Sequence, residues 1–141
     1  MAYISIVFVF DPVIGNTDTM LIRAVLAATG SPTWGIYSGY ELVENVARPG
    51  AEEQIDNEKY EYKQRDWAKA DSTGRTLAPY LTLLNQIRRE HPSLQQLRNL
   101  RVHWSDDDSV LVYTKFLDGA FTPKGRPDGI IVVANVDPHS V

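Results

Sequence analysis

Two nearby stretches of the sequence combine the residue types that bind sugars or phosphates. A glycine-punctuated apolar run, Trp34 to Glu41, is followed by the polar segment Asn57-Glu58-Lys59-Tyr60. Barrel enzymes build such sites where a buried strand opens into a long loop with aromatic, acidic and isolated basic side chains. The pattern therefore indicates a sugar or phosphate site, although Lys59 taken alone is more simply interpreted as a solvated loop lysine.

For several other side chains near this loop, a supporting role is the simpler interpretation. Glu41 and Glu44 follow the apolar run, and we expect them to orient the loop by accepting backbone or arginine hydrogen bonds. The rings of Tyr40 and Trp67 could stack on sugars, but aromatic residues beside a barrel strand are more often part of the core. The alternatives of sugar stacking and loop support stay open for Tyr40, Glu41 and Trp67.

The remaining polar clusters lack the spacing of a metal or cofactor site. His91, His103 and His139 are far apart and have no second ligand at metal spacing, so no metal site is predicted. The run Asp106 to Asp108 lacks the glycine and distal glutamate of a calcium loop and is typical of a solvated hairpin turn. The sequence has no phosphate-cradling glycine loop and no serine or cysteine nucleophile context, and we expect no cofactor.

The elements expected to position these residues form two groups. Helix formers at 20–29, closed by Gly30-Ser31-Pro32, predict a helix, and Trp34 to Tyr37 predicts a short strand after it. Residues 43–76 have no sustained apolar period and are interpreted as one long ordered loop. Such a helix-then-strand unit is typical of a parallel α/β sheet, in which the functional loop leaves the carboxyl end of the strand.

The second group begins with an amphipathic helix. Leu77, Leu81 and Leu84 share one face of it, Thr76 is the expected N-cap, and Pro92 is the expected stop. Strands are then predicted at 101–104, 110–116 and 129–136, with a tight turn between the first two. The hairpin spacing indicates an antiparallel sheet, so a domain boundary is expected near Asn99.

Composition limits the classes of function. The formal charge of -4 and a pI near 5.3 argue against a nucleic-acid partner, which requires a clustered basic face. The first apolar stretch, from Ala2 to Phe10, is far shorter than the ~20 residues that cross a bilayer, so no membrane partner is expected. The absence of cysteine suits a reducing compartment, and the cytoplasm is the expected location.

These residues carry a resemblance to a known enzyme family. The runs Thr33 to Asn45, Asp56 to Glu61, Arg65-Asp66-Trp67, Leu84 to Pro92 and Val132 to His139 are similar to the actinobacterial α-1,4-glucan:maltose-1-phosphate maltosyltransferases of the α-amylase superfamily, glycoside hydrolase family 13 type. The resemblance implies the last helix-strand-helix part of a (β/α)8 TIM barrel at residues 21–98. It further implies the beginning of an all-β C-terminal domain at 99–141, with a poorly matching segment at 1–20.

The implied activity is retaining transfer of maltosyl units from α-maltose 1-phosphate to the non-reducing end of an α-1,4-glucan, with release of phosphate. Lys59 and Tyr60 align with the family's Lys-Tyr pair that contacts the donor phosphate, and an ammonium group and a phenol suit that anion. The nucleophile and the acid/base carboxylate, ~5 to 5.5 Å apart in retaining enzymes, come from earlier barrel strands. No catalytic residue is therefore assigned, and Asn16-Thr17-Asp18 lacks the proline of the family's third-aspartate motif.

The resemblance thus implies a C-terminal fragment of an enzyme of glycogen biosynthesis, inactive alone, whose parent forms a homodimer. Two alternatives stay open. One is a non-catalytic carbohydrate- or partner-binding module, which the aromatic loop and the C-terminal strands favour. The other is a fragment of an α-amylase-type glycoside hydrolase, which would have no need for the phosphate ligands Lys59 and Tyr60.

Overall fold

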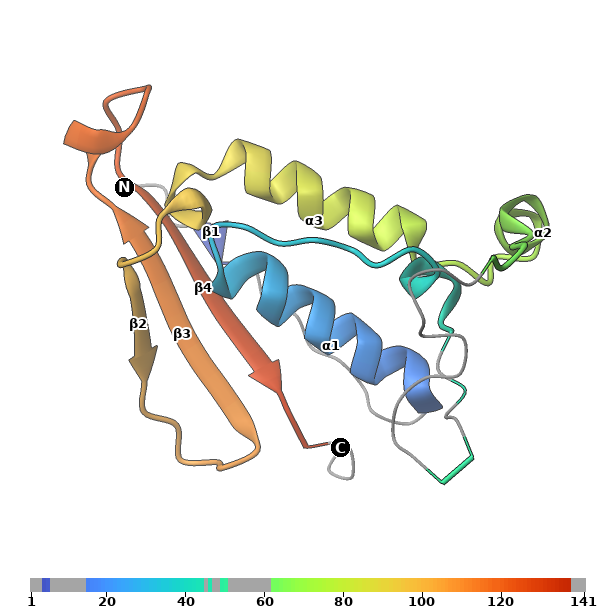
Figure 1. Cartoon of the computed structure of the whole chain (residues 1–141). Helices are drawn as coiled ribbons and strands as arrows, with labels where there is room; N and C mark the ends of the chain where they lie inside the picture. The colour runs from blue at the N-terminus through green and yellow to red at the C-terminus, as the bar shows by residue number, and fades with distance from the viewer. Residues whose placement is uncertain (1–3, 6–14, 45, 47–48, 51–61, 138–141) are drawn as a thin grey trace.

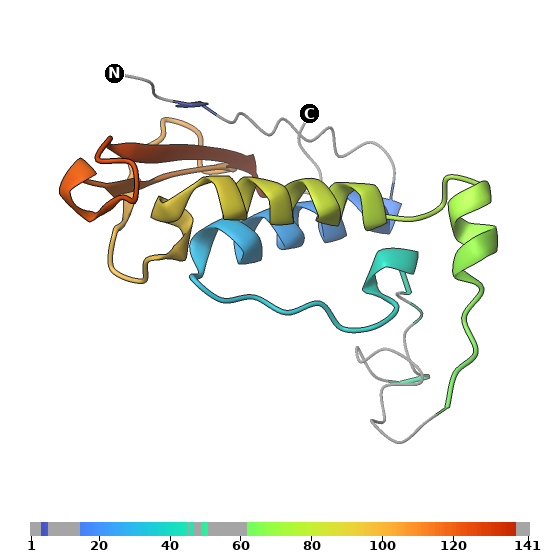
Figure 2. The ribbon, with the colours of Figure 1, turned by 90° about the horizontal axis from the view of Figure 1, so that it is seen from above.

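Two helices lie side by side on one face of a β-sheet (Figures 1 and 2). They are α1 (Gly15–Gly30) and α3 (Ala78–Glu90). The computed structural model describes residues 4–5, 15–44, 46, 49–50 and 62–137. Within these residues the chain forms a mixed α/β arrangement of two layers, and no helix there is long and apolar enough to cross a membrane.

The sheet is antiparallel over its three long strands. In the described part of the chain its order is β1-β4-β3-β2, with bounds Ile4–Ser5, Asp128–Asn135, Val110–Leu117 and Leu100–His103 respectively. Tyr113 of β3 is in register with Val132 of β4 and with Val102 of β2, whereas β1 runs parallel to β4. The helices thus pack on the central strand pair, β3–β4.

Alternation along the strands and the 3.6-residue period of the helices create one core. Paired strand residues share a face, so Tyr113 and Val132 both point toward the helices. One cluster of buried apolar residues draws on both layers and consists of Met20, Ala24, Val25, Ala28, Leu77, Leu81, Leu84, Leu94, Tyr113, Ile130 and Val132. Leu94 lies in the 3-10 turn η2 (Pro92–Gln95), which bridges α3 and the sheet.

A single arginine joins the two helices. Arg88, near the end of α3, donates through Nη1 to the carbonyls of Ala28 and Ser31, and through Nη2 to that of Pro32 at 2.6 Å. The last carbonyls of a helix have no partner within the helix. The guanidinium therefore caps the end of α1 and fixes it against α3, and burial lowers the pKa of Arg88.

Most of the predicted elements are present. The helix expected at 20–29 is the C-terminal part of α1, and the three predicted strands match β2, β3 and β4 to within one residue at each end. The helix expected from Leu77 begins at Ala78 and ends at Glu90, before Pro92. The Thr76 hydroxyl accepts from the amide of Ala78 at 3.1 Å, although Leu77 occupies the cap position.

Two expectations were wrong. Trp34 to Tyr37 is not a strand, because it joins no sheet; instead the Trp34 indole donates to Asn85 Oδ1 at 3.2 Å, and Tyr37 is 61% exposed. The supposed loop 43–76 contains the short helix α2 (Trp67–Ser72), too short to produce an apolar period. The barrel assignment and the domain boundary near Asn99 stay predictions.

Candidate functional site

A 3-10 turn, η1 (Tyr40–Leu42), lies against the N-terminal end of α3. It also contacts Gly39 and the start of α2. The carboxylate of Glu41 accepts from the Trp67 indole at 2.6 Å, and its backbone carbonyl accepts from the amide of Leu77 at 2.7 Å. Its second carboxylate oxygen accepts from the Gly39 amide at 3.1 Å. Glu41 therefore holds the starts of both α2 and α3 against the turn.

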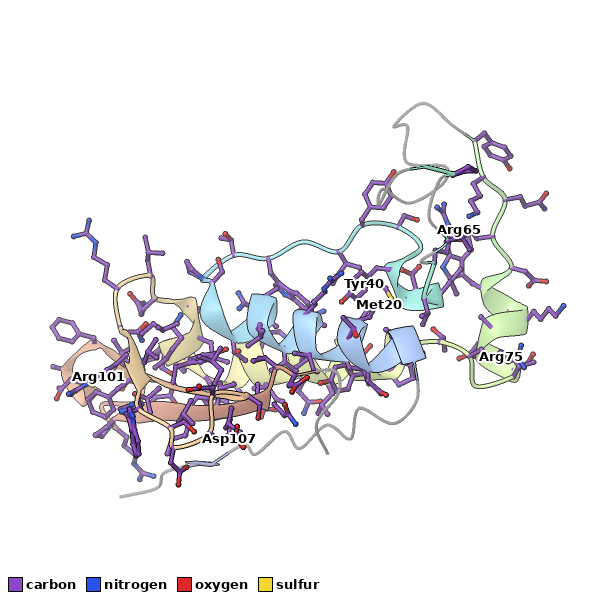
Figure 3. All side chains as sticks on the ribbon, turned by 90° about the horizontal axis from the view of Figure 1, so that it is seen from below. Met20, Tyr40, Arg65, Arg75, Arg101 and Asp107 are labelled. Atoms are coloured by element: carbon purple, nitrogen blue, oxygen red, sulfur yellow. The ribbon has the colours of Figure 1, made fainter. Side chains whose placement is uncertain are left out.

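A second carboxylate on the far side of the turn closes the loop that follows. Glu44 accepts from Arg65 Nε at 3.0 and 3.1 Å and from Arg65 Nη2 at 3.0 Å, while Lys63 Nζ lies 3.4 Å from its Oε1. Glu44 and Arg65 are 21 positions apart in sequence, and their side chains are only 15% and 13% exposed. Figure 3 shows Arg65 at the end of the molecule where α2 lies. We call the Glu44–Arg65 pair the loop clasp.

The backbone around the loop clasp has little freedom. Gly39 has φ +102°, and a Cβ there would lie 2.3 Å from Glu44 Oε2 and 2.8 Å from Arg65 Nε. Val43 has φ +57°, a conformation that β-branched residues rarely adopt. Such backbone tends to occur where surrounding contacts over-determine the structure, as in ligand sites.

The charges of the loop clasp reinforce each other. Burial alone would raise the pKa of Glu44, but hydrogen bonds and charges from Arg65 and Lys63 outweigh it and lower that pKa. The hydrogen bond to Glu44 in turn raises the pKa of Arg65. Both groups are therefore ionised at neutral pH, which keeps the bidentate contact strong.

The residues predicted for the site have different surroundings. Lys59 and Tyr60 lie outside the described residues, within the segment that the loop clasp brackets. Tyr40 is partly buried against the core and its hydroxyl donates to the Met20 carbonyl (Figure 3). Burial raises the pKa of the Tyr40 phenol. Trp67 is 47% exposed even though its indole nitrogen is bound by Glu41.

Sequence reasoning missed the importance of Gly39 and of the partner of Glu44. The run Ser38-Gly39 was a signal for a left-handed turn, but nothing in the sequence pairs Glu44 with Arg65 rather than with another arginine. Across the part of the chain that the structure describes, no three histidine, cysteine or acidic side chains gather as metal ligands would. What the turn can do is position a loop.

The chain is similar to curated bacterial proteins along most of its length. It is 52% identical over 126 residues to the α-1,4-glucan:maltose-1-phosphate maltosyltransferase of Arcanobacterium haemolyticum, and 53% identical over 126 residues to maltosyltransferase 2 of Streptomyces coelicolor. Each match covers 89% of this chain and 18% of the relative. The Mycobacterium tuberculosis H37Rv maltosyltransferase is 57% identical over 96 residues, which are 67% of this chain and 14% of the relative. The chain thus spans less than a fifth of the length of these relatives, and no family model matches it.

Proposed function

The chain is homologous to one part of the α-1,4-glucan:maltose-1-phosphate maltosyltransferases, and from this premise we propose that it forms part of the donor site of such an enzyme. The proposed reaction transfers a maltosyl unit from α-maltose 1-phosphate to the non-reducing end of an α-1,4-glucan. It proceeds by retaining double displacement, in which a carboxylate forms a glycosyl intermediate and phosphate leaves. The observation that carries this proposal is the 52% identity over 89% of the chain.

Within this reaction, the role proposed for Lys59 and Tyr60 is to bind the donor phosphate. A lysine offers three donors and a point charge to a phosphate, and a phenol adds one oriented donor. The loop clasp supports this role because it ties together the two ends of the segment that carries both residues. Joining the two ends of a segment limits the conformations open to the unfolded or free chain, which lowers the entropy cost of binding.

Tyr40, Glu41 and Trp67 are proposed as supports of the same loop. The hydrogen bonds of Glu41 to Trp67 and to the amide of Leu77 hold the two flanking helices in place. The Tyr40 hydroxyl anchors the turn to α1 through the carbonyl of Met20. These contacts favour loop support over sugar stacking for Tyr40 and Glu41.

The carboxylates that break the glycosidic bond are proposed to lie in the rest of the enzyme, outside this chain. Residues 21–98 are proposed to form the end of a (β/α)8 barrel, and residues 99–141 to begin a C-terminal β domain. The enzyme acts in α-glucan or glycogen synthesis in the cytoplasm, as a homodimer, without a metal or cofactor. The chain alone is then expected to bind the donor without cleaving it.

A second candidate is a non-catalytic carbohydrate-binding module. It is favoured by the exposed rings of Trp67 and Tyr37, which are 47% and 61% exposed on either side of the turn. Exposed aromatic side chains commonly bind sugars, because the aromatic face covers the apolar face of the sugar ring. This candidate predicts that maltose binds as well as its phosphate.

Binding of α-maltose 1-phosphate to the full chain, measured by titration calorimetry, tests the two candidates. We expect Lys59→Gln to weaken binding about tenfold, because a charge-assisted hydrogen bond contributes about 1.5–3 kcal/mol and each 1.4 kcal/mol is tenfold. Lys69→Gln, on the exposed surface of α2, is the matched control and should bind as the wild type does.

Two results would contradict the donor-site proposal. One is equal affinity for maltose and for maltose 1-phosphate, which the carbohydrate-binding candidate predicts. The other is a Lys59→Gln variant that binds like the Lys69→Gln control. Release of phosphate by the chain alone would refute the proposal that the catalytic carboxylates lie in the rest of the enzyme.

A further inference from the structure

A cleft of about 430 Å³ lies between the C-terminal end of α3 and the loop that precedes β4. This is the opposite end of α3 from the η1 turn (Figure 1). Three basic side chains, Arg89, Lys124 and Arg126, line it together with Pro92, Pro123 and Pro127. Its size lies within the range typical of small-molecule sites.

The cations of the cleft form no ion pair with Glu90 or Asp128, the two carboxylates that also line it. In the described residues, neither Arg89, Lys124 nor Arg126 makes a side-chain hydrogen bond or ion pair. One of the two carboxylates lining the cleft, that of Asp128, is already engaged by His91 Nδ1 and by the amide of Ser93, each at 2.8 Å. The cleft therefore has a surplus of positive charge.

The other carboxylate is only partly engaged. Glu90 Oε1 accepts from Gln86 Nε2 at 2.9 Å. The remaining acceptor capacity of this carboxylate can receive a hydrogen bond from a hydroxyl group. The lining thus combines anion-binding cations, an acceptor for a hydroxyl and apolar proline rings.

The loop that carries two of the cations is held in one conformation. The Thr122 hydroxyl donates to the carbonyl of Arg126 at 2.7 Å, and Asp118 accepts from the amide of Ala120 at 2.9 Å. Gly119 packs so closely that a Cβ there would lie 2.8 Å from the carbonyl oxygen of Gly125. Lys124 and Arg126 are consequently displayed by a preorganised backbone, which lowers the entropy lost on binding.

We propose that this cleft is a binding site for a small hydroxylated phosphate monoester. Arginine presents a planar fork that matches phosphate oxygens, and lysine adds a point charge, so three cations suit a dianion. The proline rings can cover the organic part, and Glu90 accepts from its hydroxyl group. The lining of the cleft includes neither Lys59 nor Tyr60, and this proposal does not depend on the proposed donor site.

Titration of the full chain with glycerol 3-phosphate, followed by amide NMR and calorimetry, tests the proposal. We expect saturable binding with amide shifts at residues 89–91 and at Thr122, Lys124, Gly125, Arg126 and Asp128. The triple variant Arg89→Gln/Lys124→Gln/Arg126→Gln should bind at least tenfold more weakly. The control Lys69→Gln/Arg75→Gln/Arg98→Gln removes the same charge at exposed positions outside the cleft and should change the affinity less than twofold.

Three outcomes would overturn the proposal: no saturable binding, equal loss in both triple variants, or inorganic phosphate binding as tightly as the monoester. All six substituted positions are exposed, so both variants should fold, and circular dichroism checks that each does. The Lys59→Gln variant should bind glycerol 3-phosphate as the wild type does, which separates a failure of this site from a failure of the donor site.

Discussion

Replacing Gly39 with alanine tests whether the loop clasp requires a residue without a side chain. At φ +102° an alanine is strained by about 1–2 kcal/mol. Its Cβ would also lie 2.3 Å from Glu44 Oε2 and 2.8 Å from Arg65 Nε, so the ends of both side chains must shift and their contact is weakened. The two effects together should lower the free energy of unfolding by about 2–4 kcal/mol.

Two other glycines separate the two effects. Gly74 has φ +67°, but a Cβ added there would meet no atom within 4 Å, so Gly74→Ala measures the backbone cost alone. Gly30→Ala has neither a positive φ nor a contact within 4 Å and should be close to neutral. Urea unfolding of all three variants gives the comparison, provided that the slope with denaturant is unchanged.

A double-mutant cycle identifies the clash. In Gly39→Ala/Glu44→Ala the side chain that lies nearest the new Cβ is gone, so the two changes should cost less together than the sum of their separate costs. Equal losses for Gly39→Ala and Gly74→Ala would refute the packing argument, and strict additivity in the cycle would refute the role of Glu44.

The remaining predictions concern the core, the helix cap and pH. Leu84→Ala, at a site 1% exposed, should cost about 2–5 kcal/mol in thermal or urea unfolding, whereas Leu83→Ala, at a site 46% exposed, should cost much less. Arg88→Met removes the cap of α1 and should cost about 1.5–3 kcal/mol; an unchanged melting temperature would contradict that role. Burial alone would raise the pKa of Asp128, but the hydrogen bonds that it accepts lower it. Its stabilisation is therefore complete above its unfolded-state pKa of about 4 and is lost as the pH falls through the folded-state value. Asp128→Asn should flatten this acid dependence in urea melts from pH 6 to 2, and the exposed Asp106→Asn should not.

The elements that could be predicted from the sequence are those whose signal is local. The leucines of α3 repeat at helical spacing, and Pro92 ends the helix, so its limits follow from neighbouring residues. The strands on either side of Asp106 to Asp108 share a tight turn, which sets their register.

One error and one omission came from contacts between residues that are far apart in the sequence. Trp34 to Tyr37 has the composition of a strand, but a strand requires a neighbour, and in this structure Trp34 instead contacts Asn85 of α3. The loop clasp joins residues 21 positions apart, and no local pattern identifies that pairing. The donor-site residues Lys59 and Tyr60 were inferred from the family resemblance, and they stay a prediction.

The position of β2 affects how the protein behaves at high concentration. In the described part of the chain β2 is the last strand on its side of the sheet, and all four of its residues are exposed. One row of its backbone groups is therefore available to pair with a second molecule, as edge strands do in aggregation. The charge of Arg101 opposes such pairing, so we expect Arg101→Val to increase light scattering at high protein concentration. If scattering stayed at the wild-type level, β2 would not be the surface that limits solubility.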